Sequence, residues 1–123
     1  MSTTKTTMPV TWFEVHTPDP DRARSFYGDV FGWDFQSVMP GYDMISLGER
    51  APIGGGIAST GPEHRPMAVF NVQVEDVRET CERITEAGGT VVAEPQETED
   101  GLAFAYVADL DGSVFGVWKP PSS

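Results

Sequence analysis

The sequence has 123 residues, of which 39% are hydrophobic, and it carries 19 acidic residues against eight basic ones. This length suits one domain, and the hydrophobic content supports an ordinary core, which excludes a mostly disordered chain. The net charge of −11 repels nucleic acid and anionic membrane surfaces, so we expect neither as a partner.

A single cysteine, Cys81, excludes an intrachain disulfide. Cys81 falls within a predicted helix, where we expect a small core or boundary residue. The opening segment MSTTKTTMPV contains no continuous apolar run, so we expect no signal peptide. No segment approaches the length needed to span a membrane. Together these features predict a cytoplasmic protein.

The first predicted elements are a strand, VTWFEV, and a helix over residues 20–31. Asp19 can cap this helix, Pro20 suits its first position, and Gly32 can close its end. Its apolar residues recur at helical spacing and form one stripe of Ala23, Phe26, Tyr27 and Val30. Three strand candidates separated by turn residues follow the helix: WDFQSVM, YDMISLG and APIGGGIA.

The second half repeats this frame 57 residues later, with Asp76 in the place of Asp19 and Gly89 in the place of Gly32. A helix is predicted over 76–87, because Asp76 and Glu79 resemble a capping box and apolar residues follow at helical spacing. Three strand candidates come next: GTVVAEP, LAFAYVA and SVFGVWK. Each half therefore predicts a β-α-β-β-β module, and the shared frame indicates duplication.

Two stretches, DPDRARSFYGDVFGW and DLDGSVFGVW, resemble the glyoxalase/bleomycin resistance protein/extradiol dioxygenase group, also called the vicinal oxygen chelate superfamily. The resemblance covers roughly residues 10 to 118. It implies an α+β fold in which two βαβββ modules form an incomplete barrel around a cavity. We expect a single domain over 1–123, with modules near 8–58 and 67–119 and a Gly- and Pro-rich linker over 59–66.

Metal-dependent members of this family hold a divalent cation with ligands from the first and last strand of each module. By resemblance, these positions fall on Trp12, Val69 and Gly116, with a fourth within residues 54–56. Such side chains offer no oxygen or imidazole to a cation. We therefore expect no metal and no cofactor, although Glu14 and His16 leave a shifted site open.

The other groups of residues that could support catalysis or phosphate binding predict no catalytic residue. Cys81 has no histidine beside it in sequence, and His64 lies in the Pro-rich linker, where a surface role is expected. The glycines at 54–56 lack the helix and lysine of a phosphate loop, so they indicate a bulge or space for a ligand near the backbone. The remaining acidic candidates lie in a turn-rich stretch and are expected on the surface: Glu94, Glu97, Glu99 and Asp100.

Alternation along the strands places Phe13 and Val15 against the helix, and it turns the other residues of the same strand toward the cavity. Applied to both modules, the same rule predicts a cavity with large rings around a few polar groups, which suits a flat ligand. The predicted ligand-binding residues are Trp12, Glu14, His16, Met44, Ser46, Asn71, Gln73, Phe104, Tyr106 and Trp118.

Two functions are compatible with these residues. The one we favour is a non-enzymatic protein that sequesters an aromatic natural product or antibiotic, as drug-binding resistance members of the family do. The alternative is an enzyme of the same superfamily, either metal-independent with Glu14 or His16 as acid or base, or a lyase, isomerase or dioxygenase with a non-standard metal site. The resemblance also implies a homodimer.

Overall fold

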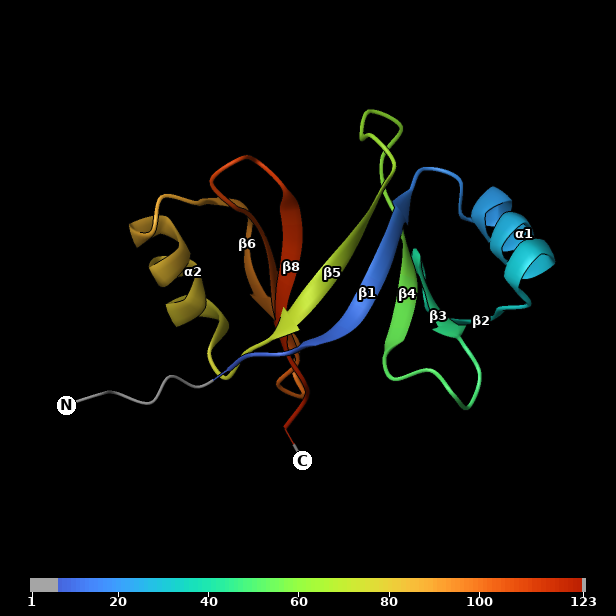
Figure 1. Ribbon diagram of the computed structural model, residues 1–123, viewed down its shortest axis with the longest axis horizontal. Helices are drawn as coiled ribbons and strands as arrows, with labels where there is room; N and C mark the ends of the chain where they lie inside the picture. The colour runs from blue at the N-terminus through green and yellow to red at the C-terminus, as the bar shows by residue number, and fades with distance from the viewer. Residues whose placement is uncertain (1–6, 123) are drawn as a thin grey trace. The chain divides into compact units, whose positions relative to one another are not determined.

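The computed structural model describes residues 7–122, and each half of the chain forms one β-α-β-β-β module (Figure 1). The first contains β1 (Val10–Thr17), α1 (Pro20–Phe31), β2 (Asp34–Met39), β3 (Tyr42–Ser46) and β4 (Gly54–Ser59). The second contains β5 (Met67–Gln73), α2 (Val77–Glu86), β6 (Thr90–Glu97), β7 (Ala103–Ala108) and β8 (Val114–Lys119). The fold class and both helices predicted from the sequence are confirmed.

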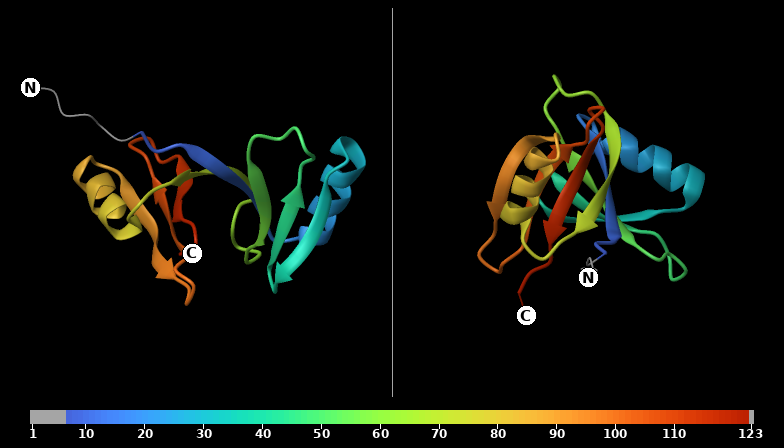
Figure 2. Two further views of the ribbon diagram at one scale, coloured as in Figure 1. Left: turned by 90° about the horizontal axis from the view of Figure 1, so that it is seen from below. Right: turned by 60° about the vertical axis from the view of Figure 1, so that its left-hand side comes forward.

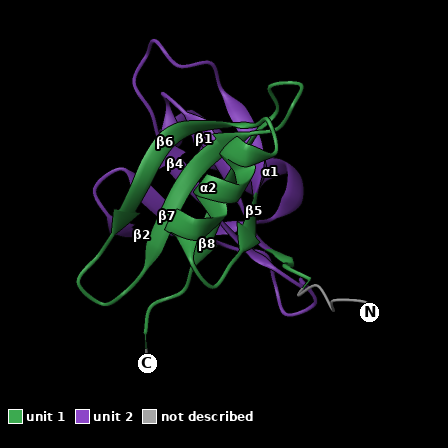
Figure 3. Cartoon of the chain, turned by 90° about the vertical axis from the view of Figure 1, so that its left-hand side faces the viewer, with its two compact units in different colours: residues 1–10, 71–123 green, residues 11–70 purple. Residues whose placement is uncertain are grey.

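The chain divides into two compact units (Figure 3). Of the described residues, one unit contains 11–70 and the other contains 7–10 and 71–122. The opening segment, for which no signal peptide is expected, lies mostly outside the described residues. Neither helix within residues 7–122 is long and apolar enough to cross a membrane.

The strands have the same order within each module. In the first, β4 pairs in parallel with β1 and antiparallel with β3, and β2 forms the next antiparallel pair. In the second, β8 pairs in parallel with β5 and antiparallel with β7, which pairs with β6. The repeat of 57 residues holds for the start of the first strand and of the helix, whereas β8 begins 60 residues after β4.

Each helix lies along one face of the strands of its own module (Figure 2). Capping follows the prediction: the Asp19 side chain accepts a hydrogen bond from the Arg22 amide, and Asp76 accepts one from the Glu79 amide. Gly32 ends α1 with a φ of 74°, in the left-handed region that favours glycine. The side chains of Asp19 and Asp76 therefore cap the N-termini of the two helices, as the sequence indicates.

In the first module, an aliphatic centre and a cluster of rings join the sheet to α1. Val15, Ile45 and Ile57 are buried, and Phe13 packs against them as predicted. Tyr27 and Trp33 stack with their ring centroids 5.1 Å apart. The predicted stripe of α1 is only half covered, because Ala23 and Tyr27 pack inward while Phe26 and Val30 are each 57% exposed.

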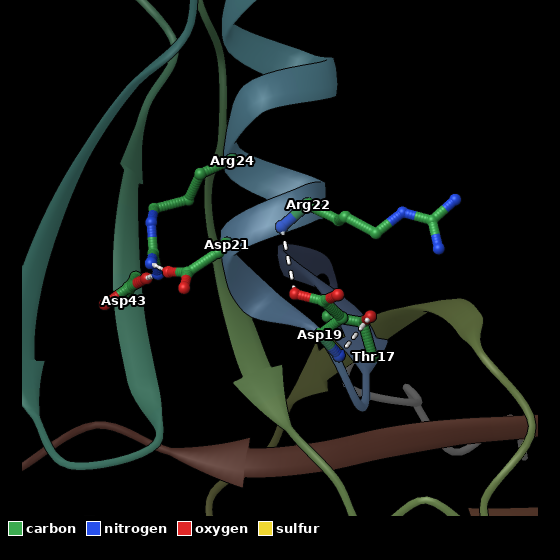
Figure 4. A network of polar contacts seen from close by, with 6 residues as sticks. All are labelled: Thr17, Asp19, Asp21, Arg22, Arg24 and Asp43. Carbon is green, nitrogen blue, oxygen red and sulfur yellow. Dashed lines mark hydrogen bonds and ion pairs between the residues drawn. The ribbon is translucent and has the colours of Figure 1, made fainter.

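A partly buried ion pair also joins α1 to β3 (Figure 4). The Arg24 guanidinium donates to the Asp43 carboxylate on β3 and to the Asp21 carboxylate one turn earlier in the helix. The Asp43 side chain is 10% exposed, whereas that of Asp21 is 88% exposed. The two acids thus make different contributions, and the pair with Asp43 connects two elements.

The second module packs its helix with small aliphatic side chains. Val77 and Cys81 of α2 are buried against a core that includes Ala105, Val107 and Val117. Of the two places that the sequence allows for Cys81, core or boundary, the structure shows the core, and burial raises the pKa of its thiol.

Candidate functional site

The face of the first module that points away from α1 carries the predicted residues of β1. Strand alternation puts Trp12, Glu14 and His16 on this face, opposite Phe13 and Val15. The pairing of β3 with β4 and of β4 with β1 brings Tyr42 and Met44 onto the same face. The chain thus collects two acid–base groups and two large rings on one side of a sheet.

These side chains form a hydrogen-bonded chain. The indole Nε1 of Trp12 donates to the Tyr42 hydroxyl over 2.8 Å, and that hydroxyl donates to Glu14 Oε2, also over 2.8 Å. The second carboxylate oxygen, Glu14 Oε1, lies 2.9 Å from His16 Nε2. Both oxygens of this buried carboxylate are therefore engaged, which satisfies a group that burial would otherwise destabilise.

Tyr42 is the residue of this hydrogen-bonded series that the sequence prediction missed. Burial, together with the nearby negative charge of Glu14, raises the pKa of Tyr42 far above its ordinary value of 10.0. The phenol therefore stays protonated and acts as a fixed hydrogen-bond relay between indole and carboxylate. It shares its parity with Met44 and Ser46, so alternation along β3 would have included it.

The three glycines at 54–56 make room for the protein's own rings. A Cβ at Gly54 would lie 2.5 Å from the Trp12 ring, one at Gly55 would lie 2.2 Å from Phe13, and one at Gly56 would lie 2.2 Å from the Tyr42 hydroxyl. The pairing of β4 runs through these residues without a register shift. The predicted bulge or ligand space is therefore wrong here, because the space is filled from within.

The corresponding face of the second module is more neutral. Asn71 pairs with Gly116 and Gln73 with Trp118 across β5 and β8, while Tyr106 and Phe104 follow on β7. This confirms that the late-strand residues share a face as predicted. The Phe104 and Tyr106 rings meet edge to face with centroids 6.3 Å apart. Asn71 is 3% exposed, so an amide is buried among rings.

A groove of about 560 Å³ lies in the unit of residues 11–70, beside α1. Phe26 and Tyr27 of the helix, Val15 and Thr17 of β1, and residues 66–68 line it. His16 is the one predicted site residue that contributes to it. The groove therefore touches the face that carries Trp12 and Glu14 at His16, while Trp12 and Glu14 do not line it.

The positions that the family resemblance assigns to a metal do not fit one. Trp12 donates its indole nitrogen to Tyr42, Val69 is a buried apolar residue, and a Cβ at Gly116 would overlap the Asn71 amide. Within residues 7–122, no three His, Cys, Asp or Glu side chains gather where they could hold a metal ion. Glu14 and His16 supply two ligands without a third acidic, thiol or imidazole group.

Residues predicted to lie on the surface do so. The His64 side chain is 63% exposed. The acidic residues of β6 and of the turn after it are exposed, although two of them lie in the strand and not in a turn. A hydrogen bond from Thr98 lowers the pKa of Asp100. The exposed acids of this stretch are Glu94, Glu97, Glu99 and Asp100.

Residues 10–117 match the glyoxalase/bleomycin resistance protein/dioxygenase superfamily. The chain belongs to this family. A Mycobacterium bovis protein named "Putative glyoxylase CFP32" is 27% identical over 116 residues, which cover 88% of this chain and 44% of that protein. The chain thus spans less than half the length of that relative. A "Glyoxylase-like domain-containing protein" of Didymella fabae is 28% identical, over 91% of this chain and 94% of its own.

The chain has the same fold as a solved structure whose name differs from those of these relatives. Methylmalonyl-CoA epimerase from Mycobacterium tuberculosis superposes with a TM-score of 0.61 at 16% identity, and the match covers 92% of this chain and 88% of the epimerase. At this identity the likeness extends to the fold alone. The ligand-binding roles predicted for the ten side chains stay predictions.

Proposed function

We propose that this protein binds a planar aromatic small molecule without transforming it. The observation that supports this most directly is the replacement of ligating side chains by rings and neutral groups. Trp12 and Gly116 stand where the family resemblance would place metal ligands, and Gly116 accommodates the Asn71 amide. Rings around a few polar groups favour stacking on a flat molecule.

The state of Glu14 also supports binding over chemistry. Its two carboxylate oxygens are engaged by Tyr42 and His16. A general base must reach the proton that it removes, so a carboxylate engaged on both sides has to exchange a partner first.

A second candidate is a metal-independent enzyme that moves a proton with Glu14 and His16. The 2.9 Å contact between these groups favours it, because a paired histidine and carboxylate can share a proton. The names of the similar proteins, glyoxylase and methylmalonyl-CoA epimerase, are names of enzymes, which supports an enzyme without indicating whether it uses a metal.

Binding of a panel of planar aromatic compounds, measured by calorimetry, tests the first candidate. Trp12→Phe should weaken binding about two- to tenfold, because ring stacking contributes about 0.5–1.5 kcal/mol beyond area burial. Trp12→Ala should weaken it further. Trp33→Phe is the matched control, since Trp33 packs on the α1 side and should leave affinity unchanged. Equal effects of the variants at the two positions would contradict the proposal.

Glu14→Gln separates the two candidates. A binding protein should keep most of its affinity, since the amide is close in shape to the carboxylate. An enzyme should instead lose turnover and still bind. Deuterium uptake from heavy water into methylmalonyl-CoA, measured by mass spectrometry with the parent and with Glu14→Gln, detects proton transfer. Uptake with the parent that disappears in the variant would favour the enzyme.

A further inference from the structure

Asn71 carries a buried polar atom whose hydrogen-bonding capacity is unused. The side chain lies on β5 and is 3% exposed. Its Oδ1 is closed off from solvent and accepts no hydrogen bond from any residue within 7–122. Because a buried carbonyl without a partner destabilises the folded protein, native structures rarely keep one unless something else pairs it.

The position of this amide is built into the sequence. A Cβ at residue 116 would lie 2.2 Å from Asn71 Nδ2 and 3.0 Å from Asn71 Cγ. Only glycine therefore leaves room for the amide in this place. Gly116 is the direct neighbour of Asn71 in the pairing of β5 with β8, so the two residues form one feature.

Aromatic side chains lie beside Asn71 and Gly116 on the same face of the sheet. Tyr106 pairs with Gly116, and its Cε1 lies 3.3 Å from the position of the missing Cβ. Phe104 pairs with Trp118 on the next row of the same face. Oδ1 therefore belongs to a face on which a flat molecule can stack. A ligand reaches this oxygen by displacing a neighbouring side chain, and the partly exposed Tyr106 is the one we expect to move.

We infer that Asn71 Oδ1 anchors the ligand by accepting a hydrogen bond from it. This inference rests on the proposed binding function and deepens it. The ligand class is a planar aromatic molecule with an O–H or N–H group on its edge, such as a phenol or an indole. Gly116 leaves the space that the Asn71 amide occupies. A position that the family resemblance assigns to a metal ligand would thus hold a neutral hydrogen-bond acceptor in place.

A matched pair of compounds tests the anchor. 2-Naphthol and 2-methoxynaphthalene share a ring system and an oxygen, but only the first donates a hydrogen bond. The parent protein should bind 2-naphthol about tenfold more tightly, which corresponds to about 1.4 kcal/mol, the size of one net hydrogen bond. Asn71→Leu should bind the two compounds equally, which also excludes the bulk of the methoxy group as the cause.

Gly116→Ala should abolish the preference as well, because its Cβ displaces the amide. Gly28→Ala is the matched control and should retain the preference, since a Cβ there meets only ordinary contacts at 3.4 Å and 3.5 Å. Stability gives a readout that needs no ligand. Asn71→Leu should raise the Tm of the free protein, because it removes an unpaired buried carbonyl and keeps the volume.

The outcomes separate the anchor from the binding function. If the parent binds both compounds equally, the anchor is wrong and the binding function stands. If the parent binds neither, the binding function fails and the anchor fails with it. A lower Tm or loss of folding in Asn71→Leu means that the oxygen already has a partner, and this overturns the anchor.

Discussion

The two modules share an order of strands and a helix cap, yet they hold their helices in different ways. α2 buries Val77 and Cys81 in an aliphatic core, whereas no residue of α1 is fully buried. α1 is held by partly exposed rings and by the ion pair of Arg24 with Asp43. A duplicated frame therefore fixes the path of the backbone and leaves the packing of each copy free to diverge.

The faces that point away from the helices also differ between the two modules. The first module places a carboxylate, an imidazole and a phenol in one hydrogen-bonded chain around Glu14. The second places the neutral Asn71 and Gln73 beside three rings, those of Phe104, Tyr106 and Trp118. Of these two faces, only the one in the first module carries a carboxylate–imidazole pair, so mutations at equivalent positions on the two faces should act differently.

The largest difference should come from the ion pair. Asp43→Ala should lower the free energy of unfolding by about 2–3 kcal/mol, because it removes a charged hydrogen bond from a nearly buried carboxylate. Urea unfolding measures the change. Asp21→Ala is the control, since the other acid bonded to Arg24 is exposed and should cost under about 1 kcal/mol. Equal costs would mean that α1 does not depend on its contact with β3.

Truncating a small buried side chain of α2 should lower the free energy of unfolding more than truncating a large exposed side chain of α1. Val77→Ala should lower the free energy of unfolding by about 2 kcal/mol, because it removes two buried methyl groups and leaves a cavity. Phe26→Ala removes a whole ring, but that ring is 57% exposed, so the cost should stay below about 1 kcal/mol. Thermal unfolding of both variants shows which is less stable. A lower stability of Phe26→Ala would show that the exposed ring of α1 contributes more than the buried Val77.

Much of this organisation is readable in the sequence, because it is written in local patterns. Asp19 and Asp76 mark the helix starts by a side chain that reaches three residues along the chain, and alternation assigns Trp12 and Tyr106 to their faces. These signals need no knowledge of the partner strand. Element order and strand parity were therefore predicted correctly in both modules.

The errors arose where a neighbouring strand decides the outcome. The glycines at 54–56 admit rings from β1 and β3, and the sequence does not show that these strands flank β4. Alternation along β3 would have put Tyr42 on the correct face, but its contact with Glu14, across 28 positions of the chain, depends on the strand pairing. Asn71 was predicted as a binding residue, but its unpaired oxygen depends on the space left at Gly116, 45 residues later.

The smallest expected effect concerns the charged face of the first module and is visible only at high pH. Burial and the Glu14 carboxylate raise the pKa of Tyr42 above 10.0 in the folded protein, so the folded state keeps a proton that the unfolded state loses. Stability from this group is complete below pH 10 and falls as the pH rises beyond it, because the unfolded state then binds fewer protons.

Between pH 9 and pH 11 the parent should therefore lose about 1.4 kcal/mol through Tyr42, the equivalent of one pH unit above the ordinary pKa. Tyr42→Phe has no phenol to titrate, so its unfolding free energy should fall less over the same interval. The difference between the two slopes, measured by urea unfolding at each pH, isolates this one group from the lysines and other tyrosines. Parallel slopes would show that the phenol ionises as easily in the folded as in the unfolded protein, and the relay between Trp12 and Glu14 would then not hold its proton.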